Sequence, residues 1–138
     1  MILNQIDRNN YFKGLLVLVG IRRKITKTEE VSVKNVAKIL DLNQNFVDDV
    51  IKKFHENKYI IETPPKFSNH ILAEIFLRDG MRVAFTDKML HLHELEWLAR
   101  FAVNNNFSKQ WFFIELENYL ESYMLSPSNS FEIQNYIN

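Results

Sequence analysis

The amino-acid sequence predicts an all-α protein that folds as a single compact bundle of six to seven helices. Only three glycines and three prolines occur among 138 residues, which is too few turn residues for hairpins or β-sandwiches. Apolar residues recur at steps of three and four along most of the chain, as they do on the buried face of a helix. Residues that cap helices precede several of these segments.

The first half contains three expected helices. Residues 10–24 are apolar on nearly every side and end in cations, as in a helix at the centre of a core. Thr26 and Glu29 match a capping box, in which a hydroxyl and a carboxylate each bind a free backbone amide at a helix start. Asn43 is a good N-cap for a third helix, which we expect to reach about residue 58.

The second half contains three more expected helices, separated from the first half by two prolines. Ser68 is expected to cap a long helix over residues 69–86, and a fifth helix is expected over residues 92–105. Ser108 is expected to cap a sixth helix over residues 109–123.

The two halves share their helix-capping and helix-ending residues at an offset of 65 residues. When residues 25–54 are laid on residues 90–119, the apolar matches alone are close to chance, but these boundary residues coincide. The coinciding pairs are Thr26 with His91, Glu29 with Glu94, Ala37 with Ala102, Asn43 with Ser108 and Phe46 with Trp111. The pattern therefore predicts a three-helix unit that occurs twice.

This repeat gives the expected domain organisation. One helical domain covers residues 1–124 and contains two pseudo-symmetric units, at about residues 10–58 and 68–123. The apolar helices of the two units, around Leu16 and Phe76, are expected to pack together at the centre of the bundle.

The remaining residues, 125–138, form a polar C-terminal tail that we expect to be held loosely. Phe131, Ile133 and Tyr136 are the side chains of the tail that could dock on the bundle.

Charge and composition disfavour several classes of protein. Basic and acidic side chains number 17 each, with 11 basic and 7 acidic groups in residues 1–58 and an acidic excess in residues 59–138. A net charge of zero disfavours a nucleic-acid binder, which gathers positive charge to meet phosphates.

The sequence contains no cysteine, so there are no disulfides, thiolate metal sites or thiol nucleophiles. The longest apolar run is far shorter than the roughly 20 residues of a membrane helix, so we expect a cytoplasmic protein with no membrane span.

A distinctive run of residues lies in the second half. Residues 76–87 read Phe-Leu-Arg-Asp-Gly-Met-Arg-Val-Ala-Phe-Thr-Asp, and a capped helix that opens with Glu94 follows. This run resembles the TerB-like family, named for tellurite resistance. The signature of that family is a helix ending in Ala-x-Ala-Asp-Gly, a short turn, and a capped helix opening with Glu. The resemblance is clearest over residues 67–117 and fainter over residues 11–54.

The resemblance implies an all-helical bacterial domain that is often internally duplicated. It implies a binding or scaffolding module tied to stress and defence systems, with divalent-metal binding suggested for the acidic sites. It does not imply an enzyme.

The acidic pair of the family pattern falls on Asp87 and Glu94 in this chain. The neighbouring His91 would turn such a site toward Zn²⁺ or another transition metal ion, and Asp79 is a further acid. Lys88 stands where the family has glycine, which places an ammonium group beside the site. Helix capping also explains Glu94 without a metal, because this residue occupies the third position of its expected helix. A divalent ion is the one cofactor that the sequence suggests.

The alternative function is that of a DNA-binding regulator. A short turn separates the helices expected at residues 27–40 and 44–58, as in a helix-turn-helix, and residues 59–63 would form a wing. The second of these helices opens with Asp48 and Asp49, whose carboxylates would face phosphates and base edges. We therefore expect no nucleic-acid partner.

The sequence offers little support for catalysis. It contains no nucleophile elbow, phosphate-binding glycine loop or HExxH pair. We therefore predict a non-catalytic interaction or scaffold module of the TerB-like type with protein partners, and the sequence leaves a divalent-metal response open.

Overall fold

The computed structural model describes residues 3–21, 24–56, 63–85, 89, 91–125 and 130–137. These residues form six α-helices and one short 3-10 helix, with no strand among them, so the predicted all-α class is confirmed for the described chain. The elements are α1 (Gln5–Gly20), α2 (Lys27–Ile39), α3 (Gln44–His55), α4 (His70–Ala84), α5 (Leu92–Asn104), α6 (Lys109–Leu125) and the 3-10 helix η1 (Glu132–Asn135). None of the helices in these ranges combines the length and the apolar character that crossing a bilayer requires.

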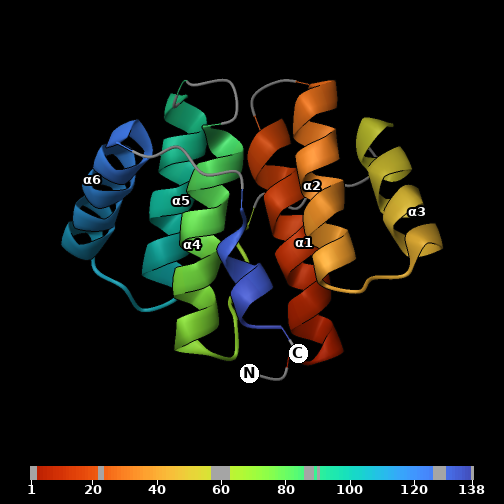
Figure 1. The fold of residues 1–138 in the computed structure, drawn as a ribbon, viewed down its shortest axis with the longest axis horizontal. Coiled ribbons are helices and arrows are strands. Elements are labelled where there is room, and N and C mark those ends of the chain that lie inside the picture. Colours follow the sequence, from red (N-terminus) through yellow and green to blue (C-terminus); the bar gives the residue numbers. More distant parts are fainter. Residues whose placement is uncertain are drawn as a thin grey trace.

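α1 and α4, whose residues are largely buried, lie side by side at the centre of the bundle (Figure 1). α2 and α5 flank this pair, and α3 and α6 are the outermost helices. The ring of Tyr11 in α1 meets the ring of Phe76 in α4 edge-on, with centroids 5.0 Å apart. A helix without a polar face must be enclosed by other elements, and α1 contacts α2, α4 and α5.

Aromatic side chains form the centre of the core. The ring of Phe76 lies 4.5 Å from the ring of Phe101, 5.3 Å from that of Phe67 and 6.1 Å from that of Trp97, measured between centroids. All four side chains are buried. The three ring pairs are tilted, and contacts between aromatic rings contribute beyond the burial of apolar area, so this cluster joins α4, α5 and the chain that precedes α4 into one unit.

Three of the predicted helix starts are confirmed with their caps. Thr26 and Glu29 form the complete capping box, because the Glu29 amide donates to Thr26 Oγ1 at 3.1 Å and the Thr26 amide donates to Glu29 Oε1 at 2.9 Å. The side chain of Asn43 accepts from the amides of Asn45 and Phe46 at the start of α3. Ser108 Oγ accepts from the amide of Trp111 at 3.0 Å in the first turn of α6.

Two predicted helix starts are wrong. Asn69 caps α4 in place of Ser68, and its side chain accepts from the amides of the second and third helical residues. The hydroxyl of Ser68 instead donates to Asp7 in α1. α1 begins at Gln5, several residues before the expected start, because Asn4 caps it by accepting from the Asp7 amide at 2.7 Å.

The starts of the helices recur at a constant spacing along the chain. α1 and α4 begin at residues 5 and 70, α2 and α5 at residues 27 and 92, and α3 and α6 at residues 44 and 109, which is a separation of 65 residues each time. The two non-glycine residues with positive φ among the described residues, Asp41 and Asn106, are also 65 residues apart. Each of them follows the second helix of its half.

The described part of the C-terminal tail packs against the bundle instead of being held loosely. Figure 1 shows η1 in front of the seam between α1 and α4, and contacts with α4 hold it there. Phe131 and Ile133 are buried, as their apolar character allows, whereas Tyr136 is 38% exposed. The tail therefore contributes two side chains to the core.

Candidate functional site

A cluster of polar side chains lies where the tail meets α4. Asp79, in the middle of α4, is only 1% exposed. Its Oδ1 accepts the backbone amide of Glu132 at 2.7 Å, and its Oδ2 accepts the amide of Ile133 at 3.1 Å and the hydroxyl of Tyr11 at 2.6 Å. One buried carboxylate thus binds α1 and two consecutive amides of the tail.

The electrostatics of this cluster follow from its burial. Burial raises the pKa of Asp79 from its ordinary value of 3.8 to about 6, although the hydrogen bonds from Tyr11, Glu132 and Ile133 favour the charged form. Burial, together with the nearby charge of Asp79, also raises the pKa of Tyr11 well above 10. Tyr11 therefore stays protonated near neutral pH and remains a donor to the carboxylate.

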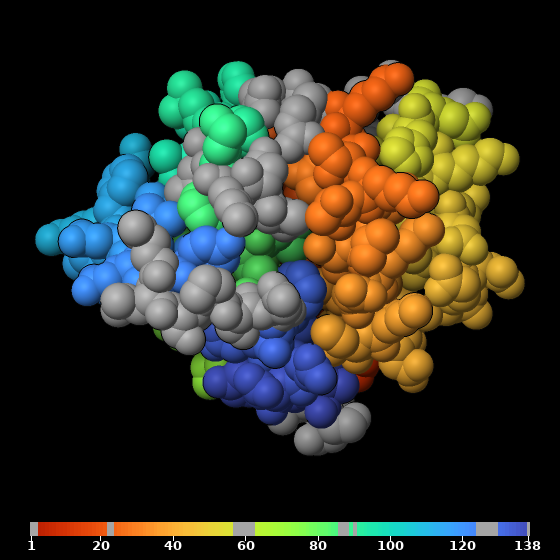
Figure 2. Space-filling view, turned by 45° about the horizontal axis from the view of Figure 1, so that its top comes forward, coloured from red at the N-terminus to blue at the C-terminus, as the bar shows by residue number. Residues whose placement is uncertain are grey.

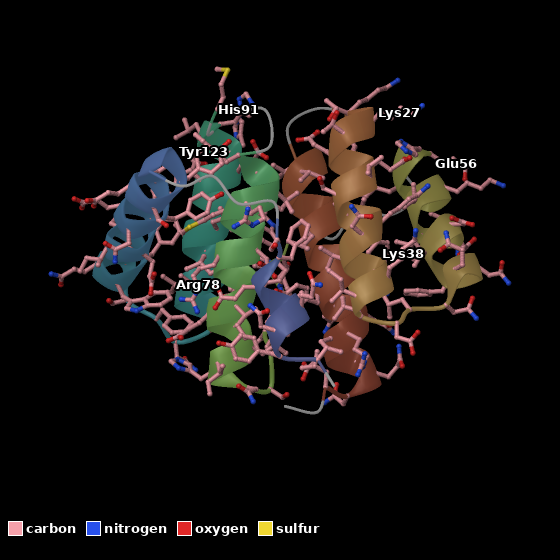
Figure 3. The ribbon with its side chains drawn as sticks, viewed as in Figure 1. Lys27, Lys38, Glu56, Arg78, His91 and Tyr123 are labelled. Carbon is pink, nitrogen blue, oxygen red and sulfur yellow. The ribbon has the colours of Figure 1, made fainter. Side chains whose placement is uncertain are left out.

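Arg78 extends the cluster to the surface and to α6. Its Nε and one terminal nitrogen donate to the two carboxylate oxygens of Glu132 at 2.7 and 2.8 Å, a paired geometry that favours guanidinium–carboxylate binding. The same guanidinium lies 3.6 Å from Glu115 in α6 and 3.9 Å from Glu74 in α4. Hydrogen bonding to Glu132 is the main reason that the pKa of Arg78 is raised. Figure 3 labels Arg78 on α4, the helix from which it reaches these partners.

A cavity of about 250 Å³ lies next to this cluster, between α4, α6 and the tail. Its lining includes Arg78, Asp79, Arg82, Tyr119, Ser122 and Glu132. The hydroxyl of Tyr119 is buried and makes no hydrogen bond with the described part of the chain, and burial raises the pKa of this group. The cavity therefore presents polar groups within a mixed polar and apolar lining, and it is large enough for a side chain or a small polar molecule.

Of the three predicted metal ligands, the structure describes His91 and Glu94. Asp87 and Lys88 lie outside the described residues. His91 is the N-cap residue of α5, at the predicted place, but its side chain does not cap the helix. Glu94 is the third residue of α5 and is buried. The described chain contains no group of three possible metal-binding side chains, and the proposed site with Asp87 stays a prediction.

The sequence did not predict the Asp79 cluster as a tail-binding site. The sequence pattern offers Asp79 only as one more acid for a metal. The available signal was its position, because Asp79 shares a helix face with Ile75, Phe76 and Val83, all of which are buried. An acid on such a face requires hydrogen-bond donors, and nothing local indicates that they come from residues more than 50 positions later.

Comparison of the chain with protein-family models, with curated proteins and with solved structures finds no match.

Proposed function

We propose that this chain is a non-catalytic interaction module of the TerB-like type, made of two pseudo-symmetric three-helix units and serving a bacterial stress or defence system. The bundle is then a rigid scaffold, and its partners are proteins that dock on its outer helices. A divalent ion bound near Asp87, His91 and Glu94 would add a metal response to this role.

The recurring helix starts support the duplicated architecture in this proposal. All three pairs of helices start 65 residues apart, and so do the two residues with positive φ, Asp41 and Asn106. The buried third residues of α2 and α5, Glu29 and Glu94, also share this offset. A coincidence of starts, turns and buried acids is more specific than the apolar matches in the sequence.

The outer face of α6 carries the proposed interaction role. Phe113 is 54% exposed and the adjacent Ile114 is 51% exposed. Glu117 and Glu121 follow on the same exposed face, at helical spacing. Single exposed apolar residues are common on proteins, but an aromatic and an aliphatic side chain side by side within a polar rim have the composition of a protein interface. The partner that fits presents an apolar patch bordered by basic residues.

Site-specific photo-crosslinking tests this proposal. A benzophenone amino acid at Phe113 is expected to capture a discrete partner in cells of the source organism. The same amino acid at Val31 in α2, which is 50% exposed, is the matched control. A second variant, Glu117→Lys, should weaken the capture at position 113 because it removes the acidic rim. Equal capture at positions 113 and 31 would contradict the proposal. Capture at position 113 that is unchanged by Glu117→Lys would also contradict it.

The charges on α3 favour this role over DNA binding. Asp48 and Asp49 are exposed in the first half of α3, and Asp49 lies 3.0 Å from Lys53, so one of the two lysines of that helix is partly neutralised. Residues 57–62, which would contain most of the wing, lie outside the described residues. Fluorescence polarisation with random duplex DNA at low salt is expected to show no salt-sensitive binding. Affinity that falls steeply with added salt would favour the DNA-binding alternative.

A further inference from the structure

The described tail, residues 130–137, is held against α4 in the way that a receptor holds a peptide. Two apolar anchors, Phe131 and Ile133, enter the core, and the residue between them, Glu132, accepts hydrogen bonds from two of the three guanidinium nitrogens of Arg78. Figure 2 shows this segment, in dark blue, on the surface of the bundle. Two buried anchors around one charged contact are the arrangement by which short peptides are recognised.

The receptor side of this contact is a built site. Asp79 is buried in the middle of α4, too far from the start of that helix to cap it. Both of its oxygens instead accept amides at the start of η1, the end of a helix at which free N–H groups collect. A buried carboxylate is costly unless it is hydrogen-bonded, so this side chain depends on an amide pair from a bound segment.

The described residues of the tail, 130–137, leave part of the site unfilled. The cavity of about 250 Å³ beside Glu132 is lined by Arg82, Tyr119 and Ser122, and the buried Tyr119 hydroxyl makes no hydrogen bond within the described chain. A segment with a polar side chain that enters this space would make contacts that the tail does not make. The site is therefore more extensive than its present occupant.

We propose that this groove binds partner proteins through segments with an aromatic–Glu–aliphatic pattern, and that the chain's own Phe131-Glu132-Ile133 occupies it as a tethered competitor. A tethered segment acts at an effective concentration in the millimolar range, so a partner must make additional contacts to displace it. The cavity supplies room for such contacts. The tail of a second copy adds no contact that the chain's own tail lacks, while association costs translational and rotational freedom, which favours a different partner.

A labelled peptide of residues 130–137 tests the proposal with the full-length chain. The peptide is titrated by fluorescence anisotropy against the wild type and against the variant Phe131→Ala/Glu132→Ala, whose tail is weakened. We expect the variant to bind at least about tenfold more tightly than the wild type, because its groove is available. Circular dichroism of each protein establishes that it is folded. If the double variant does not fold, Glu132→Gln keeps both anchors and carries the same comparison.

Charge reversal identifies the binding mode. Adding Arg78→Glu to the weakened variant should lower the affinity for the peptide by about tenfold or more, and a peptide with Arg at the Glu132 position should restore it. Arg100→Ala, at an exposed arginine of α5, is the matched control and should change nothing.

Three results of the peptide titration would overturn the proposal: no binding to a folded variant with a weakened tail, binding that is insensitive to Arg78, or equally tight binding to the wild type. A wild-type dimer that forms with increasing protein concentration and is lost in Glu132→Ala would mean that two copies exchange their tails in the groove. That result would also overturn the proposal. Crosslinking at Phe113 does not involve this groove, so the two proposals can fail separately.

Discussion

The hydroxyl of Tyr11 donates to the carboxylate of Asp79 across the seam between α1 and α4, at 2.6 Å. Both side chains are buried, and the two residues are 68 positions apart in the sequence. The bond connects the central helix pair to the tail, because the same carboxylate accepts the amides of Glu132 and Ile133. The stability of the core and the position of the tail therefore depend on one side chain.

Replacing Tyr11 by phenylalanine should destabilise the protein. The change removes a hydrogen bond to a buried carboxylate, and the expected loss in the free energy of unfolding is about 1–3 kcal/mol at pH 8. The loss should be smaller at pH 5, where Asp79 is largely neutral and the bond is no longer charge-assisted. Urea denaturation at the two pH values measures both effects. Tyr136→Phe, at a partly exposed tyrosine of the tail, is the control, and an equal loss in both variants would contradict the assignment.

The buried Asp79 should make stability decrease as pH rises between about 4 and 6. Its carboxyl keeps a proton up to a pKa of about 6 in the folded state but only up to 3.8 in the unfolded chain. The folded state therefore binds more protons in this window, and the contribution of Asp79 to stability is full below pH 3.8 and is lost as pH rises through 6. The total change from this group is up to about 3 kcal/mol.

The difference between wild type and Asp79→Asn isolates this effect, because the other carboxylates titrate in both proteins. We expect the free energy of unfolding of the wild type to fall relative to that of the variant between pH 4 and pH 7. Charged neighbours of the site, Glu132 and Arg78, are unchanged in both proteins. If the difference in unfolding free energy between the wild type and Asp79→Asn stays constant with pH, or if the wild type becomes relatively more stable as pH rises, the carboxyl of Asp79 is not protonated as described.

Arg78 and Glu132 should be energetically coupled. Their paired hydrogen bonds are 2.7 and 2.8 Å long, and both side chains are more than two-thirds buried. A double-mutant cycle of Arg78→Ala and Glu132→Ala should give a coupling energy of about 1 kcal/mol, which lies near the upper end for partly exposed ion pairs. Each single variant should also accelerate hydrogen exchange at the amides of Glu132 and Ile133. A coupling energy of zero with unchanged exchange would mean that the pair does not hold the tail.

The helix positions were predictable because their signals are local. The capping box at Thr26 and Glu29 needs only four consecutive residues to act, and the caps at Asn43 and Ser108 are equally short-range. The start of α4 was mispredicted because Ser68 and Asn69 are both good caps. The distant acid Asp7 determines which of them is used, since it accepts the hydroxyl of Ser68.

The tail-binding site was not predictable for the opposite reason. Every contact of Asp79 in the site is long-range, to Tyr11 in one direction and to Glu132 and Ile133 in the other. No periodicity connects a mid-helix acid to two amides of a distant polar segment. The local pattern shows only that an acid interrupts an apolar face, which indicates a buried polar contact but not its partner.

Gly20, the last residue of α1, should not tolerate a side chain. A Cβ built there would overlap the end of the Phe54 ring from α3 and would lie 3.3 Å from Cγ1 of Ile25. Gly20→Ala should therefore cost about 1–3 kcal/mol in stability, despite the better helix propensity of alanine. The same substitution in a Phe54→Ala background should cost much less, because the ring is gone. Equal costs in both backgrounds, measured by urea denaturation, would show that α3 does not pack on this position.

The proposed metal site makes a prediction that does not depend on the tail. If Asp87, His91 and Glu94 bind a divalent ion, Mn²⁺ or Zn²⁺ should raise the melting temperature, and an ion at 100 times its dissociation constant adds about 2.7 kcal/mol of stability. Asp87→Ala should abolish this shift. Asp48→Ala, at an exposed acid of α3, is the control and should leave it intact. A wild type whose melting temperature does not change with any of Ca²⁺, Mg²⁺, Mn²⁺ or Zn²⁺ would remove the metal response, because a ligand that binds the folded state must stabilise it.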